Sequence, residues 1–225
     1  MTSAGSKKKP RTAPPEVRRK QLIDATITCI SKRGISGTTL SDVTKEAGLS
    51  LGLVNFHFKN KDALLAETLK TLAEEHRALW MRALKRDELT AADKLRVMVD
   101  AQFHPRICSR KKLAVWFAFF GEAAHRRSYR LSSAHIDIER QEISADLCRQ
   151  IIAEGDYDGV DAEGVSLTLE SLFDGFWLNM LMYPAKFRRE DAAHRVLSYL
   201  STVFPMHFAV RGESAAISPD MSYLR

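Results

Sequence analysis

The residues best suited to a chemical task are the lysines and arginines in the first quarter of the chain. Up to Lys61 there are 12 Lys and Arg against 4 Asp and Glu, a net charge of +8. The rest of the chain carries 22 against 24, so the formal charge of +6 on the 225 residues comes from this first segment. Such an asymmetry indicates a module that binds a polyanion, joined to a nearly neutral body.

Two short spacings in the body could support catalysis or metal binding, but both are incomplete. Ser109 and Lys112 fit the S-x-x-K spacing of a serine nucleophile and its lysine base, without the companion motifs. His104 and Cys108 are spaced like two metal ligands on one helix face, but a third ligand is lacking and Pro105 lies between them. The chain has no G-x-S-x-G, no phosphate-binding loop and no G-x-G-x-x-G after a strand. We therefore expect no enzyme, no cofactor and no metal site.

The elements that position these residues are predicted to be helices throughout, which makes the chain an all-α protein. Apolar residues make up 45%, as in a globular chain, while 11 Gly and 7 Pro are too few for a turn-rich sandwich or barrel. A first helix is expected to begin near Pro15 and to end at Gly34. The later helices of the body are expected over 60–86, 91–107, 110–124, 127–154, 161–183 and 188–207.

Two shorter helices are expected between Gly34 and Asn60. Thr39 can begin the first of them as its N-cap, with Asp42 completing a capping box, and Gly48 ends it. Ser50 is expected to cap the second, which covers 51–58. Two short helices joined by a tight, glycine-containing turn are a helix-turn-helix.

The cysteines and the hydropathy indicate a chain that stays in the reducing cytoplasm. Cys29, Cys108 and Cys148 are far apart and form no C-x-x-C, which is typical of reduced thiols. No apolar run reaches the length of a membrane span, and the amino terminus lacks the apolar region of an export signal.

The segment from Thr38 to Leu65, TTLSDVTKEAGLSLGLVNFHFKNKDALL, resembles the TetR family of bacterial transcriptional regulators. The family pattern is, loosely, T-x-x-x-I-A-x-x-A-G-V-S-x-G-x-[LIV]-Y-x-[HY]-F-x-x-K-x-x-L. It is matched without gaps by Thr39, Val43, Ala47, Gly48, Leu49, Ser50, Gly52, Val54, His57, Phe58, Lys61 and Leu64. The resemblance implies a helix-turn-helix whose second helix, 50–57, enters the major groove of DNA. A helix-turn-helix that serves only protein packing is the alternative, and the charge of +8 on the first 61 residues disfavours it.

The resemblance also implies which residues contact DNA. The expected set is Thr39, Ser50, Leu51, Gly52, Leu53, Asn55, Phe56, His57, Lys59 and Lys61. Lys61 is expected to reach a phosphate, and Asn55 to contact either an adenine edge or a phosphate. Family members often have Tyr where this chain has Asn55 and a Lys or small polar residue where it has Leu51, and Thr44 replaces a usual Ala. These departures bear on the DNA sequence that is read rather than on the fold.

The second half resembles the BetI subgroup, regulators of choline and glycine betaine metabolism. The resemblance lies in Ala114 to Leu131, AVWFAFFGEAAHRRSYRL, and Leu169 to Met182, LESLFDGFWLNMLM. Aromatic rings beside a carboxylate can hold a quaternary ammonium ligand through cation–π contacts. The expected ligand-binding residues are Trp116, Phe120, Glu122, Asp174 and Trp177. Alternatively, most of these rings are core or dimer packing, and Asp174 makes a buried hydrogen bond or salt bridge to an Arg or a helix end.

Four parts of the chain are expected, the two tails from their composition and the two domains from the resemblances. They are a flexible basic tail over 1–15, the helix-turn-helix DNA-binding domain over 16–76, a helical ligand-binding and dimerisation domain over 77–208, and a flexible tail over 209–225. The last two helices look apolar on two sides, and the family implies that they pair two subunits in a four-helix bundle. We expect a homodimeric repressor that binds a pseudo-palindromic double-stranded operator and responds to a small-molecule effector, such as a quaternary ammonium or other amine. The alternatives are a DNA-associated adaptor whose body binds a protein, and a helical enzyme with a vestigial DNA module.

Overall fold

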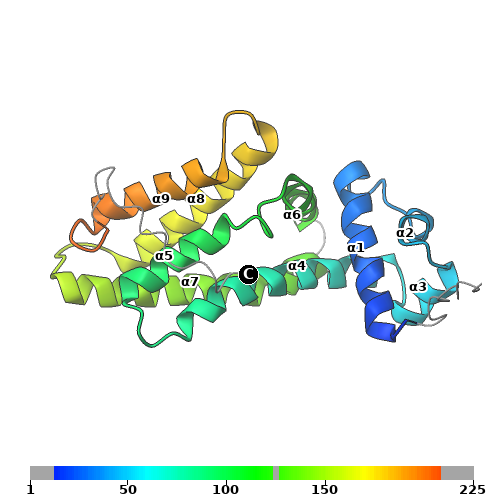
Figure 1. The fold of residues 1–225 in the computed structure, drawn as a ribbon, viewed down its shortest axis with the longest axis horizontal. Helices are drawn as coiled ribbons and strands as arrows, with labels where there is room; N and C mark the ends of the chain where they lie inside the picture. The colour runs from blue at the N-terminus through cyan, green and yellow to red at the C-terminus, as the bar shows by residue number, and fades with distance from the viewer. Residues whose placement is uncertain (1–12, 124–126, 209–225) are drawn as a thin grey trace, which may run out of the picture. The chain divides into compact units, whose positions relative to one another are not determined.

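The computed structural model describes residues 13–123 and 127–208, and the part it describes consists of helices and their connections without a strand (Figure 1). The expected all-α class is confirmed. The helices are α1 (Pro15–Arg33), α2 (Leu40–Ala47), α3 (Leu51–His57), α4 (Lys61–Leu84), α5 (Ala91–Gln102), α6 (Arg110–Ala123), α7 (Arg127–Gly155), α8 (Ala162–Met182) and α9 (Arg189–Val203). The residues of the two expected tails that lie in 1–12 and 209–225 are outside the described ranges.

The chain divides into two compact units, Met1–Thr68 and Leu69–Arg225, and the division falls inside α4. In the first unit, α1 packs on α2, and α2 packs on α3. Its core is apolar and includes Leu22, Ile30, Val43, Val54, Phe58 and Leu64. The side chains of Val43 and Val54 are 1% and 0% exposed, so this core sets the angle between α2 and α3.

The turn between α2 and α3 is made possible by Gly48. Its φ of 64° lies in the left-handed region, where a side chain would be strained. Its N–H bonds to the carbonyls of Lys45 and Thr44, which closes the last turn of α2. The helix-turn-helix therefore has the geometry that its glycine predicts.

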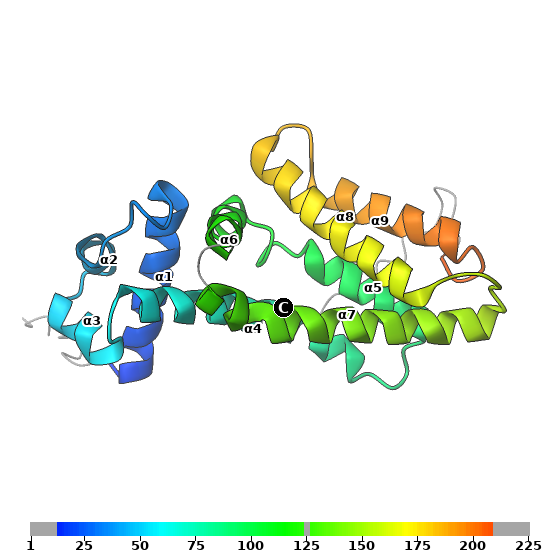
Figure 2. The same ribbon diagram turned by 180° about the vertical axis from the view of Figure 1, so that it is seen from behind.

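The second unit holds a larger core formed by α5 to α9 and the end of α4. In it α8 packs on α7, α6 and α9, and α5 packs on α7 and α9. The helices α8 and α9 lie side by side in both views (Figures 1 and 2). Large, fully buried side chains such as Trp80, Phe119 and Phe204 fill the space between these helices.

Two expected helix ends were wrong, and a proline explains each. The helix expected over 91–107 ends at Gln102, because the ring of Pro105 would clash with the carbonyl of Ala101 in a continued helix. The helix expected over 188–207 ends at Val203, because Pro205 disfavours the helical conformation at Phe204, whose φ of −125° and ψ of 65° lie outside the helical region. The first of these ends shapes the cavity described below.

All three thiols are buried. Burial raises the pKa of Cys29, and it raises the pKa of both Cys108 and Cys148 to about 12. None of the helices in the described ranges is long and apolar enough to cross a membrane.

Candidate functional site

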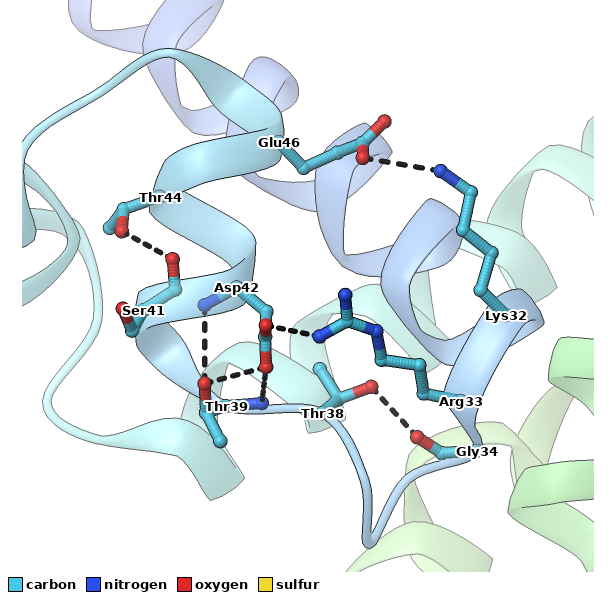
Figure 3. A network of polar contacts seen from close by, with 9 residues as sticks. All are labelled: Lys32, Arg33, Gly34, Thr38, Thr39, Ser41, Asp42, Thr44 and Glu46. Atoms are coloured by element: carbon cyan, nitrogen blue, oxygen red, sulfur yellow. Dashed lines mark hydrogen bonds and ion pairs between the residues drawn. The ribbon is translucent and has the colours of Figure 1, made fainter.

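A polar network fixes the start of α2 against the end of α1 (Figure 3). The Asp42 amide donates to the Thr39 hydroxyl at 3.1 Å, and an Asp42 carboxylate oxygen accepts from the Thr39 N–H at 3.0 Å and hydroxyl at 2.7 Å. Arg33 forms an ion pair with the same carboxylate, and Lys32 pairs with Glu46 at 3.3 Å. The bonds from Thr39, aided by Arg33, hold the pKa of Asp42 below its ordinary value. The expected capping box is present, and the hydroxyl of Thr39 is committed to it.

The helix α3 presents one face to solvent. Leu51 is 51% exposed and Phe56 is 76% exposed, and Gly52 and Asn55 are exposed between them. Leu53 and His57 are half-buried on the opposite side, next to the buried Val54. The Phe56 ring meets the His57 ring edge to face at a centroid distance of 5.0 Å. This exposed face contains four of the residues that sequence analysis assigned to DNA binding.

Ser50 corrects one expectation. It occupies the N-cap position of α3, but its side chain makes no capping hydrogen bond. The third residue of α3 is Leu53, whereas α2 has Asp42 at the equivalent position, so no reciprocal carboxylate orients the Ser50 hydroxyl. The hydroxyl is exposed at the edge of the α3 face.

The basic side chains around α3 are held to different degrees. Lys59 is exposed, whereas the ammonium of Lys61 donates to the carbonyl of Ile35 at 3.0 Å. Arg19 pairs with Glu67 at 2.6 Å and lies over the Phe58 ring at 5.1 Å. An ammonium has three donors, so the Ile35 bond orients Lys61 and leaves donors for a phosphate.

The second unit contains a cavity of about 270 Å³. Its lining comes from α4 to α8 and consists of His76, Gln102, Trp116, Phe120, Asp137, Arg140, Gln141, Leu167, Glu170, Phe173, Asp174 and Trp177. The lining contains four of the five residues that sequence analysis predicted to bind a ligand, namely Trp116, Phe120, Asp174 and Trp177. The fifth, Glu122, is not part of the lining.

Aromatic rings that contact one another at tilted angles form part of the cavity lining. The Trp116 ring lies 5.9 Å from Phe120 and 6.1 Å from Trp177, and His76 lies 5.7 Å from Trp177 on the other side. The Trp177 indole N–H donates to the backbone carbonyl of Gln102 at 2.9 Å. Trp116 and Trp177 are only 5% and 4% exposed, so their orientations are set by packing.

Charged residues form another side, and sequence analysis missed most of them. Arg140 bonds to Glu170 through Nε at 3.0 Å and through a terminal nitrogen at 2.5 Å, and contacts Asp137 at 3.3 Å. Although burial opposes its charge, the bonds to Glu170 raise the pKa of Arg140. A signal was available, because Arg140 lies on the same buried stripe of α7 as Ile136 and Ser144, where an apolar side chain is typical.

Asp174 differs from the alternative reading, in which it makes a buried hydrogen bond or salt bridge. It is accessible at the edge of the cavity rather than buried, and it makes no hydrogen bond or ion pair within the described ranges. Partial loss of hydration raises its pKa, the charge of Glu170 adds to the rise, and Arg140 opposes it. With Asp137 and Glu170 it gives the lining three carboxylates against one guanidinium.

Two buried polar atoms of the lining have no hydrogen-bond partner in the described part of the chain. They are Nε2 of His76 and Nε2 of Gln102. Burial and the charge of Arg140 hold the pKa of His76 well below its ordinary value, so its imidazole is neutral. Because buried polar atoms are normally paired, the part of the cavity beside His76 and Gln102 suits a ligand with a hydrogen-bonding group.

Comparison with known proteins agrees with both halves of the chain. Residues 22–68 match the model of bacterial regulatory proteins of the tetR family, and residues 91–205 match the C-terminal model of the BetI-type transcriptional repressor. The HTH-type transcriptional regulator BetI of Paraburkholderia xenovorans is 31% identical over 197 residues, covering 86% of this chain and 97% of the relative. That of Paraburkholderia phymatum is 33% identical over 194 residues, covering 85% and 95%.

Solved structures give the same result for the fold. A putative transcriptional regulator from Pseudomonas aeruginosa matches with a TM-score of 0.76 and 28% identity, covering 88% of this chain and 96% of that one. A putative regulator from Saccharomonospora viridis, solved in complex with choline, matches with a TM-score of 0.73 and 18% identity, covering 83% and 96%. The chain is thus a DNA-binding transcriptional regulator and not an enzyme, as predicted. It belongs to the TetR family of bacterial transcriptional regulators, in the BetI type.

Proposed function

We propose that the chain is a cytoplasmic, homodimeric repressor that releases its operator when a small organic cation enters the cavity of the second unit. The observation that carries this proposal is the composition of the cavity lining. Two tryptophans that are fixed by packing lie in the same lining as three carboxylates, of which Asp174 alone makes no hydrogen bond or ion pair within the described ranges.

The lining favours a cation for two physical reasons. Each aromatic face that meets a cation contributes about 0.5–2 kcal/mol, and most when water is excluded. The carboxylates exceed the single guanidinium of Arg140, and Glu170 is already bonded to it, so an incoming cation meets an excess of negative charge beside Asp174. An anion would meet repulsion at the same place.

The size and the polar end of the cavity narrow the effector further. A volume of about 270 Å³ accommodates a small metabolite. The unpartnered nitrogens of His76 and Gln102 suit an oxygen on the ligand. Choline, found in the structurally similar regulator from Saccharomonospora viridis, is such a molecule, and control of choline or glycine betaine metabolism by this chain is part of the proposal.

The exposed face of α8 supports a two-fold dimer. Leu167, Leu178 and Met182 are 53%, 45% and 59% exposed along one stripe of this helix. Between them Ser171 and Gly175 lie in a shallow groove of about 150 Å³, where a helix from a second subunit can approach closely. Pairing through α8 and α9 would present two α3 helices about 34–36 Å apart to a pseudo-palindromic operator.

The proposal is tested by measuring operator release. Fluorescence anisotropy with DNA from upstream of the chain's own gene should show binding that weakens as choline or betaine aldehyde is added, and calorimetry should show heat for the same compounds. Glutarate, a small dicarboxylate anion, should do neither. Absence of heat with every amine tested would contradict the effector class, and the helical body would then have to bind a partner of another kind, as an adaptor would.

A further inference from the structure

The exposed face of α3 carries a restricted set of side chains. At about 100° per residue, Leu51, Asn55, Gly52 and Phe56 follow one another around an arc of about 140°. All four are exposed, and Val54 on the opposite side is fully buried. The arc is therefore the part of the helix-turn-helix that can face a major groove.

The charged side chains that usually read a G·C pair are absent from this arc. Arg and Lys bind the guanine O6 and N7 edge, and Asp and Glu accept from the cytosine amino group. The four residues of the arc are instead two large apolar side chains, an amide and a glycine. An amide can bond to N6 and N7 of adenine, and an apolar side chain packs on the C5 methyl group of thymine.

We propose that Phe56 and Leu51 are specificity-determining residues that pack on thymine methyl groups in each operator half-site, next to an adenine contacted by Asn55. This inference rests on the proposed operator binding, and it names the base pairs that the operator presents to α3. Exposed positive charge lies outside the arc, on Lys59 after the end of α3 and on Lys45 in the last turn of α2, and is available for phosphates.

The surroundings of Phe56 support a direct contact. Its side chain is 76% exposed, so it does not serve the core of the unit. Its ring is held edge to face by His57 at 5.0 Å, and the His57 ring lies 6.3 Å from the buried Phe58. A large ring that is exposed but oriented loses little conformational freedom when it is covered.

The chemistry is tested with DNA that lacks only the methyl groups. High-affinity duplexes are first selected from a randomised pool with the full-length protein, and the best is then made with thymidine or with deoxyuridine. We expect A·T pairs in both half-sites, and a loss of about fourfold in affinity for each contacted methyl that is removed. Phe56→Ala should lower affinity for the thymidine duplex. At the thymine that Phe56 contacts, this variant should bind a duplex with deoxyuridine as well as one with thymidine.

The matched control is Val17→Ala, which removes an exposed apolar side chain on α1, outside the exposed face of α3, and should keep the full thymidine preference. Phe56→Tyr keeps the ring and should keep most of the preference. Equal affinity of the unmodified protein for both duplexes would overturn the inference while leaving operator binding intact. A thymidine preference that survives Phe56→Ala and Leu51→Ala together would also overturn it, and a pool without any enriched duplex would overturn operator binding as well.

Discussion

The indole N–H of Trp177 donates to the backbone carbonyl of Gln102 at 2.9 Å, and this bond exists because α5 ends early. In a continuous helix that carbonyl would accept from the amide of Arg106, which instead donates to the His104 ring at 3.1 Å. The break at Pro105 thus frees an acceptor that orients an aromatic wall of the cavity, and the Cys108 thiol uses the same acceptor at 3.0 Å.

Replacing Trp177 by Phe should separate this bond from ring packing. We expect a loss of about 0.5–1.5 kcal/mol in the free energy of unfolding beyond the loss of volume, because the Gln102 carbonyl loses one donor and keeps the weaker one from the Cys108 thiol. The control is Trp80→Phe, since the buried Nε1 of Trp80 has no hydrogen-bond partner among the described residues. Chemical denaturation of both variants gives the difference, and equal destabilisation would show that the bond contributes nothing.

Asp174→Asn should weaken effector binding at least tenfold, because the variant removes the cavity carboxylate that has no bonded partner within the described ranges. Glu122→Gln changes the same chemistry on α6 outside the lining and should leave affinity within about twofold. Titration calorimetry with a trimethylammonium ligand measures both. If Glu122→Gln proved the more damaging change, the ligand would lie elsewhere.

Lys61→Met should weaken binding to specific and non-specific duplexes alike. One lost phosphate contact lowers the slope of log affinity against log salt by about 0.9. Lys32→Met is the matched control, because Lys32 is paired with Glu46 and should change the slope less. Affinities measured between about 50 and 200 mM salt give the slopes. An unchanged slope with lower stability would mean that the bond to Ile35 is the whole role of Lys61.

Asp100→Asn should stabilise the protein at neutral pH. Burial raises the pKa of Asp100 to about 6, with Arg96 opposing, so the ionised form is less favourable in the folded chain than in the unfolded one. This destabilisation is absent below about pH 4, grows as the pH rises and is complete above about pH 6, where its removal adds at most about 3 kcal/mol. Thermal melts at pH 4 and pH 7 test the sign of this effect on the free energy of unfolding. The control is Asp87→Asn at an exposed position, which should change the free energy of unfolding by no more than about 0.5 kcal/mol at either pH.

Gly175→Leu should produce a folded monomer. A Cβ at Gly175 meets nothing within 4 Å in the subunit, so the new side chain fills the groove on α8 without disturbing its own fold. Gly121→Leu on α6 is equally unhindered and serves as the control. Light scattering after gel filtration should show a dimer for the control and half that mass for Gly175→Leu. A dimer in both cases would place the subunit contact elsewhere.

The helices could be predicted closely because their boundaries are set by local chemistry. Pro15 and Gly34 bound α1, and Thr39 and Gly48 bound α2, as their side chains or lack of them dictate. Local chemistry was misjudged at the far ends of α5 and α9, where a proline acts on residues before it. The expected span 91–107 included Pro105, although the proline ring excludes this residue from a helix interior.

The cavity could be predicted only in part, for a different reason. Trp116 and Trp177 stand out because aromatic residues cluster on two segments that the fold brings together. The partners His76, Gln102 and Glu170 come from other helices, and only tertiary packing places them beside those rings. Glu122 was expected to supply a carboxylate to the aromatic rings, yet it follows Phe120 by two residues, and side chains so spaced on a helix point about 200° apart.

The reactivity of the three buried thiols can report where the protein opens locally. Thiolate is the form that reacts with alkylating agents, and pKa values of about 12 for Cys108 and Cys148 keep nearly all of it protonated at neutral pH. Labelling therefore waits for each site to open. Cys29 reports on α1, Cys108 on the α5–α6 connection beside Trp177, and Cys148 on α7. The order in which the three are modified, with and without effector, would map where ligand binding rigidifies the molecule, without any added label site.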